Sequence, residues 1–154
     1  MLYDPIRRSL VTAKPEEKVR QKFIQIMIGE LGFPKGLLAV EKEVASLSPL
    51  STVDPHRRID ILVLAPGKEG LQPLLLVECK AESIDEAALS QVLGYNRAIG
   101  APFICLTNGI LTKTFWKQKN EMVSISFLPS FSQLMRCKQK NTLFIEADKL
   151  FNFS

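Results

Sequence analysis

Three short apolar runs constrain the fold of this chain most: residues 58–64 (RIDILVL), 74–78 (LLLVE) and 102–107 (PFICLT). Each run has the length and composition of a buried β-strand. The first two flank residues 65–72 (APGKEGLQ), whose glycines and proline predict a hairpin and antiparallel pairing. A helix-length segment, 84–99, separates the second run from the third, and strand–helix–strand order predicts parallel pairing. We therefore predict an α/β fold built on a mixed β-sheet.

Helices are expected to flank this sheet. Residues 15–32 (PEEKVRQKFIQIMIGELG) begin with proline and two acids, repeat apolar residues at helical spacing and end in glycine, which predicts a helix. The segment 84–99 also has helical spacing, and Ser83 or Asp85 could cap it. The remaining elements are predicted as strands at 37–44, 112–117 and 122–127, a turn at Asn108-Gly109, and a weak helix from Pro129.

The length and the cysteine pattern bound the class of protein. A chain of 154 residues can bury its own core, and we expect residues 1–154 to form one domain. No apolar run reaches the roughly 18 residues of a membrane span, and the charges within residues 1–18 argue against an export signal. Cys79, Cys105 and Cys137 are odd in number and far apart. This pattern predicts reduced thiols in a cytoplasmic protein and argues against a zinc site.

The charge balance suits a nucleic-acid partner. The formal net charge is +4 and the pI is about 9.0. An excess of cations attracts phosphate backbones, although a solvated basic surface would have the same composition. The basic residues gather near the start and in the last third of the chain: Arg7, Arg8, Lys14, Lys113, Lys117, Lys119, Arg136, Lys138 and Lys140.

The pattern that carries chemistry is one acid inside a strand and an acid and a lysine at the end of the next. Asp60 interrupts an apolar strand, which is costly unless the carboxylate is paired or binds a cation. Glu78 and Lys80 are two residues apart and project from the same face of a strand, whereas Cys79 points away. If the strands form a hairpin, Asp60 lies beside Glu78. Carboxylates in such an arrangement suit Mg²⁺, for which Mn²⁺ can substitute, although a structural ion pair would use the same residues.

Two helices offer further polar groups. Glu16 lies seven residues before Phe23 on the same helix face, so its carboxylate is expected on the side of the sheet, whereas Glu17 is expected to turn away. Glu16 could instead simply favour the helix N-terminus. Gln91 and Tyr95 are four residues apart and share a face of the second helix, where an amide and a phenol could position water or phosphate. A surface glutamine and a partly buried tyrosine are the alternative.

Taken in order, these segments resemble a known family. The run PEEKVRQKFIQIMIGELGFPKGLLAVEKEV, followed by RRIDILVL, LLLVECKAES and ALSQVLGYNRAIGAPFICLTNG, resembles the N-terminal nuclease domain of type I restriction enzyme R subunits, within the PD-(D/E)XK nuclease superfamily. The resemblance covers about residues 13–127 and leaves 128–154 as a C-terminal extension. It implies a restriction-endonuclease-like mixed sheet flanked by helices, and Mg²⁺-dependent hydrolysis of DNA.

The resemblance also implies a role for each residue of the series. Asp60 and Glu78 would hold the metal together with the backbone carbonyl of Cys79, and Lys80 would be the catalytic lysine. Glu16 would match the acid of the first helix, with Glu17 as the alternative because two acids stand there. Gln91 would match the motif glutamine, and Tyr95 would accompany it.

The chain also departs from the complete R subunit. No phosphate-binding G-x-x-x-x-G-K-[ST] loop occurs, so ATP is expected to play no part, and the chain is expected to be a small stand-alone relative. A non-catalytic DNA- or protein-binding module that retains the nuclease fold is the alternative function. The sequence leaves open RNA as a substrate, endonuclease or exonuclease mode, and a homodimer or larger complex.

Overall fold

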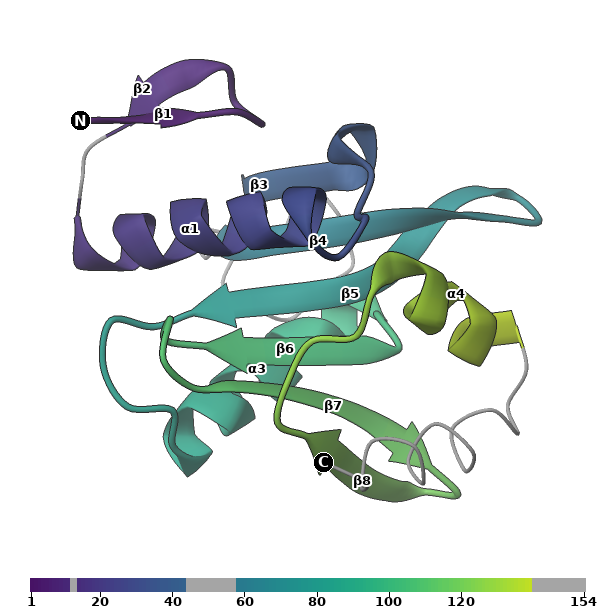
Figure 1. Cartoon of the computed structure of the whole chain (residues 1–154). Coiled ribbons are helices and arrows are strands. Elements are labelled where there is room, and N and C mark those ends of the chain that lie inside the picture. Colours follow the sequence, from purple (N-terminus) through teal and green to yellow (C-terminus); the bar gives the residue numbers. More distant parts are fainter. Residues whose placement is uncertain (12–13, 44–57, 140–154) are drawn as a thin grey trace.

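A six-stranded mixed sheet forms the centre of the protein (Figure 1). The structure is a computed structural model that describes residues 1–11, 14–43 and 58–139. Neighbouring strands are antiparallel except β5 and β6, which are parallel as predicted. In sheet order the strands are β3 (Leu38–Glu43), β4 (Arg58–Gly67), β5 (Gly70–Cys79), β6 (Phe103–Thr107), β7 (Thr112–Gln118) and β8 (Glu121–Ile125). The predicted α/β class and mixed sheet are confirmed.

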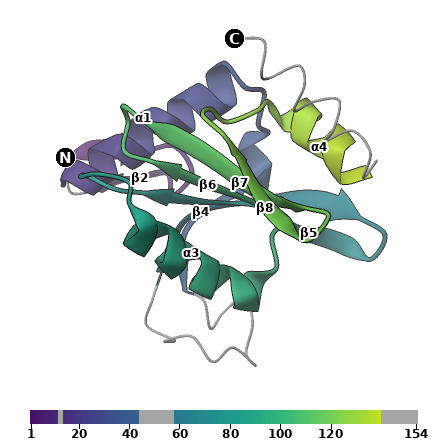
Figure 2. The ribbon, with the colours of Figure 1, turned by 90° about the horizontal axis from the view of Figure 1, so that it is seen from below.

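In the part of the chain that the structure describes, three helices cover the two faces of this sheet (Figure 2). Helices α1 (Pro15–Gly29) and α4 (Phe131–Gln139) lie on one face, and α3 (Glu86–Ile99) lies on the other. A short 3₁₀ turn, η1 (Lys35–Leu37), leads into β3. Among the described residues, none of the helices combines the length and apolar character that a membrane span requires.

The hairpin of β4 and β5 is longer than predicted. The sequence predicts a loop over 65–72, but the strands continue to a two-residue turn at Lys68 and Glu69. The paired residues include Pro66 and Pro73. Both prolines lie beyond the last residues that pair with β3 and β6. This part of the hairpin is therefore a two-stranded ribbon, where a missing N–H donor is tolerated.

A small N-terminal hairpin was not predicted. Strands β1 (Leu2–Asp4) and β2 (Ser9–Val11) form a separate two-stranded sheet beside α1 (Figure 1). Asp4 is fully buried and accepts hydrogen bonds from the backbone N–H groups of Ile6 and Arg7. Strands of three residues are too short to show periodicity in the sequence, and the Asp4 carboxylate supplies the hydrogen bonds of the turn between them.

The ends of the helices follow local hydrogen bonds. Helix α1 stops at Gly29 rather than at Gly32, which has a φ of 71° and lies in the turn after the helix. Asp85 caps α3, since its Oδ1 accepts a hydrogen bond of 2.8 Å from the N–H of Ala88. Gly100, with a φ of 76°, ends the same helix. Of the two cap residues considered, Asp85 is the one used. The end of the predicted strand at residue 44, Lys140 and the rest of the extension lie outside the described residues.

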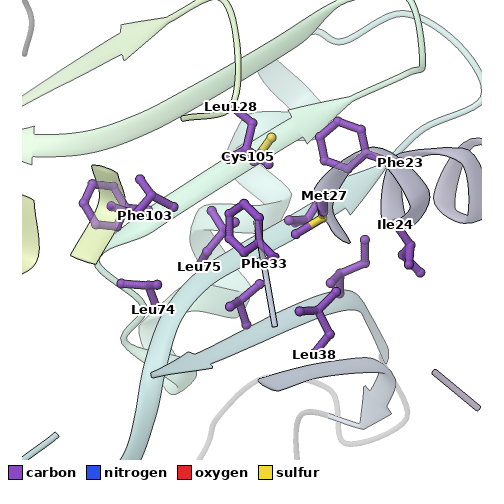
Figure 3. Close-up of a cluster of buried hydrophobic side chains, with 14 of the residues drawn as sticks. Phe23, Ile24, Met27, Phe33, Leu38, Leu74, Leu75, Phe103, Cys105 and Leu128 are labelled. Carbon is purple, nitrogen blue, oxygen red and sulfur yellow. The ribbon is translucent and has the colours of Figure 1, made fainter. Parts of the chain in front are cut away.

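The larger buried cluster lies between α1, α4 and the sheet (Figure 3). Phe33 is central to it, is 2% exposed and makes an edge-to-face contact of 5.6 Å between ring centroids with Phe131 of α4. Met27 and Leu75, from α1 and β5, are both fully buried in the same cluster. This packing fixes the first helix against the strands that carry Asp60 and Glu78.

Phe33→Ala is expected to lower the free energy of unfolding by about 3–5 kcal/mol, because it removes a buried ring and leaves a cavity between α1 and α4. Urea unfolding followed by circular dichroism measures the change. Leu71→Ala is the control, since Leu71 is 58% exposed and its loss should change stability by less than about 0.5 kcal/mol. Equal effects of the two substitutions would contradict this account of the core.

Candidate active site

Two carboxylates face each other where β4 begins and β5 ends. The β4–β5 register pairs Ile61 with Val77, and its continuation by one residue places Asp60 opposite Glu78. Both are largely buried, with side-chain exposures of 14% for Asp60 and 11% for Glu78. Asp60 Oδ2 accepts a hydrogen bond of 2.7 Å from the N–H of Cys79, so a side chain takes the place of the next ladder bond. The hairpin thereby fixes the orientation of the first acid.

Lys80 completes the group. Its Nζ lies 3.5 Å from Glu78 Oε1 and donates a hydrogen bond of 3.0 Å to Gln91 Oε1 on α3. Its backbone N–H donates to the carbonyl of Thr107 on β6. Cys79 is fully buried in the cluster that includes α1, so the alternation expected along the strand holds. The structure therefore brings Asp60, Glu78, Lys80 and Gln91 together.

Burial and mutual repulsion shape the electrostatics of the pair. Burial raises the pKa of Glu78 to about 8; the neighbouring Asp60 carboxylate raises it as well, whereas Lys80 opposes the rise. Burial also raises the pKa of Asp60, against the lowering effects of the Cys79 N–H and of Arg20. The nearby positive charges therefore do not fully offset the cost of burying the two carboxylates in their ionised form.

The donor set fits a small divalent cation. Glu78 Oε2 is buried and has no hydrogen-bond partner among the described residues, which leaves one carboxylate oxygen with its lone pairs unused. The described residues hold no group of three or more His, Cys, Asp and Glu side chains suited to a metal. Mg²⁺ is commonly held by one or two carboxylates, with waters and phosphate oxygens filling the rest of its shell. Two facing carboxylates match that requirement better than they match zinc.

The two acids of α1 have different surroundings. Glu16 is exposed and, with Lys80, Gln91 and the loop before α3, lines a pocket of about 370 Å³. Its charge also raises the pKa of Asp60, so it faces the same site. Glu17, which is expected to turn away from the sheet, is 6% exposed. Its burial was not predicted, because it comes from Arg7 and the N-terminal hairpin, which cover this side of the helix.

Glu17 is the centre of a buried polar network. Its Oε1 accepts hydrogen bonds from Arg7 Nη2 at 2.8 Å and from Gln21 Nε2 at 2.7 Å. Its Oε2 lies 2.6 Å from Arg20 Nη2. Both oxygens of Glu17 are thus engaged in hydrogen bonds and ion pairs within the fold. Glu16 is the acid of α1 that lines the pocket.

Arg20 was not singled out from the sequence. It is 5% exposed, and its Nη2 lies 3.9 Å from Asp60 Oδ1. Its charge lowers the pKa of Asp60. The only sequence signal is its position three residues after Glu17, a spacing that permits an ion pair on one helix face.

Tyr95 is buried on the same helix as Gln91. It is 7% exposed and packs with Val92 in the cluster between α3 and the sheet. It stays a predicted companion of Gln91, one helical turn further along α3. The backbone carbonyl of Cys79 stays a predicted metal ligand.

Comparison with known proteins adds a family to this geometry. A family model described as the type I restriction enzyme R protein N terminus matches residues 15–131, which is most of the chain and includes every predicted site residue. Neither the curated proteins nor the solved structures include a significant match. The chain therefore belongs to the family of type I restriction enzyme R protein N termini.

Proposed function

We propose that this domain is a metal-dependent nuclease that hydrolyses phosphodiester bonds of DNA. The observation that carries the proposal is the buried pair of Asp60 and Glu78 with the Lys80 ammonium 3.5 Å from the second acid. Membership in a family named for restriction enzyme R proteins supports a nuclease relationship and DNA as the substrate.

Asp60, Glu78 and the carbonyl of Cys79 would hold Mg²⁺, or Mn²⁺ in its place. A bound ion of this kind supplies a Lewis acid for the phosphoryl oxygen and makes a bound water more acidic. The chain contributes a preorganised site, because the Cys79 N–H fixes Asp60 and the β-hairpin fixes the distance between the acids.

Lys80 would act on the attacking water and on the phosphate. Its ammonium is held by Gln91 Oε1 and Glu78 Oε1, so it is directed toward the carboxylate pair rather than into solvent. There it can orient a water molecule and offset charge that develops on the phosphate. Gln91 would position Lys80, and Glu16 would contribute a further carboxylate at the mouth of the pocket. Tyr95 would support Gln91 from the same face of α3.

A direct assay tests the proposal. The protein is incubated with plasmid and linear DNA in Mg²⁺ or Mn²⁺, in EDTA, and with or without ATP, beside Asp60→Ala. We expect metal-dependent, ATP-independent cleavage by the wild type only. Equal cleavage by both proteins would indicate a contaminating nuclease and overturn the assignment.

The same assay separates the second candidate function. DNA binding that weakens with salt in both proteins, without cleavage by either, would favour a non-catalytic module that keeps the fold. A parallel arm with RNA tests the choice of substrate.

A further inference from the structure

Two aliphatic side chains project from the turn between β6 and β7. The turn spans residues 108–111, and we refer to it as the apolar turn. Ile110 is 90% exposed and Leu111 is 60% exposed. Two exposed aliphatic residues side by side make a small contiguous apolar projection, and contiguous apolar surface rimmed by polar residues is a candidate contact site.

The apolar turn is held firmly by its own hydrogen bonds. Asn108 Oδ1 accepts hydrogen bonds from the N–H groups of Ile110 at 2.9 Å and Leu111 at 2.7 Å. The N–H of Asn108 donates to the carbonyl of Leu111, and Thr107 Oγ1 accepts from the N–H of Gly109. The exposed side chains are therefore presented by an ordered backbone, so a partner would not have to order the turn.

The apolar turn adjoins the carboxylate site. The carbonyl of Thr107, just before the turn, accepts from the N–H of Lys80 at 2.9 Å. Asn108 Nδ2 donates to the carbonyl of Glu82, which lines the pocket beside Lys80. A Cβ at Gly109 would lie 3.8 Å from Val19 of α1, so the turn also touches the first helix. In Figure 1 this connection lies at the end of the sheet where β5 terminates.

Exposed lysines stand on the two elements next to the apolar turn, α1 and β7. Lys18 and Lys22, which flank Val19 on α1, are exposed, and so is Lys113 at the start of β7. Lysine is depleted at protein–protein interfaces. Lysines beside an apolar tip suit a nucleic acid, whose phosphates would contact the lysines while its bases contact the apolar side chains. The charge pattern thus favours nucleic acid over protein as the occupant.

We propose that the apolar turn is a DNA-contacting element, in which Ile110 and Leu111 pack against the bases and sugars of the duplex bound at the Asp60–Glu78 site. Aliphatic side chains that enter the minor groove partly unstack a base step and bend the duplex. At this place they would open the duplex next to the bond that is cut. The inference rests on the proposed function for the identity of the ligand.

The double substitution Ile110→Ser with Leu111→Ser tests this role. DNA binding is measured by fluorescence anisotropy in Ca²⁺, and cleavage is measured in Mg²⁺. We expect Kd and KM to rise by about tenfold or more, because two aliphatic contacts are lost. The dependence of Kd on salt should be unchanged, since no phosphate contact is removed.

Leu71→Ser is the matched control. Leu71 is 58% exposed, nearly as much as Leu111, but it stands at the far tip of the β4–β5 hairpin. It should leave Kd, KM and cleavage at wild-type values. Lys18→Ala removes a cation instead of an apolar contact, so it should reduce the salt dependence of Kd, which the double substitution leaves unchanged.

Each outcome decides the inference. Equal Kd for the double variant and the wild type would overturn it, as would an equal loss in Leu71→Ser. A double variant that changes only self-association would show that the turn contacts protein instead. Because binding is measured without cleavage, a protein that binds DNA through the turn but does not cut would contradict only the proposed function.

Discussion

Replacing Lys80 by alanine is expected to lower the rate of DNA cleavage by roughly two to four orders of magnitude, the range typical of a lost general acid–base or charge-stabilising group. The Nζ atom lies 3.5 Å from Glu78 Oε1 and donates a hydrogen bond to Gln91, whereas the Arg20 guanidinium lies on the Asp60 side of the pair. The loss should appear in kcat at saturating metal, while the Kd for DNA stays close to the wild-type value. Single-turnover cleavage with excess enzyme measures it.

Two companion variants sharpen the result. Gln91→Ala leaves the ammonium in place but removes its hydrogen-bond acceptor, so we expect an intermediate loss of about tenfold. Lys80→Arg keeps the charge with a different shape and is expected to recover only part of the rate. A Lys80→Ala protein that cuts at the wild-type rate would remove Lys80 from the reaction and leave the carboxylate pair without its proposed assistant.

The second large effect concerns stability without metal. Glu78 has a pKa of about 8 in the folded protein, above its ordinary 4.5, because it is buried beside Asp60. The folded state therefore holds a proton that the unfolded chain releases, and this contribution to stability is complete below pH 4.5 and is lost as pH rises through about 8. A shift of this size corresponds to about 5 kcal/mol at most, and it already includes the lowering effect of Lys80 on the pKa of Glu78.

We therefore expect the Tm of the protein in EDTA to fall between pH 5 and pH 8.5, and Mg²⁺ or Mn²⁺ to restore much of it at the upper end. Glu78→Gln removes the titrating group and should flatten both responses. Differential scanning calorimetry across this range, with and without metal, gives the comparison. A wild-type Tm that is independent of pH and metal would contradict the buried carboxylate pair.

The centre of the fold could be predicted because its determinants are local. An apolar run on each side of a glycine-containing turn fixes the β4–β5 hairpin, and the helix after it dictates the parallel neighbour β6. The same reasoning placed Asp60 beside Glu78 and set Lys80 on the side of Glu78, because strand alternation and antiparallel register leave little choice. Distances, burial and the Gln91 contact needed the tertiary structure.

The surroundings of α1 could not be predicted in this way. Helical periodicity gives the direction of a side chain relative to its own helix. It does not show whether another element packs against the side of the helix that faces away from the sheet. The burial of Glu17 was not predicted because the hairpin of residues 2–11 carries no strand pattern, and that hairpin buries it with Arg7. Arg20 was missed for the same reason, since an arginine on a helix is ordinary until a carboxylate is found beside it.

The β4–β5 hairpin also bears on the order of folding. Asp60, Glu78, Lys80 and Gln91 fall within a single contiguous stretch, in which one turn and the helix after it create every contact between them. Closing so short a stretch costs little chain entropy, so this part can form before the N-terminal segment docks. The charged centre would then exist while α1 is still unpacked, and a divalent ion that bound early could nucleate the remainder of the chain.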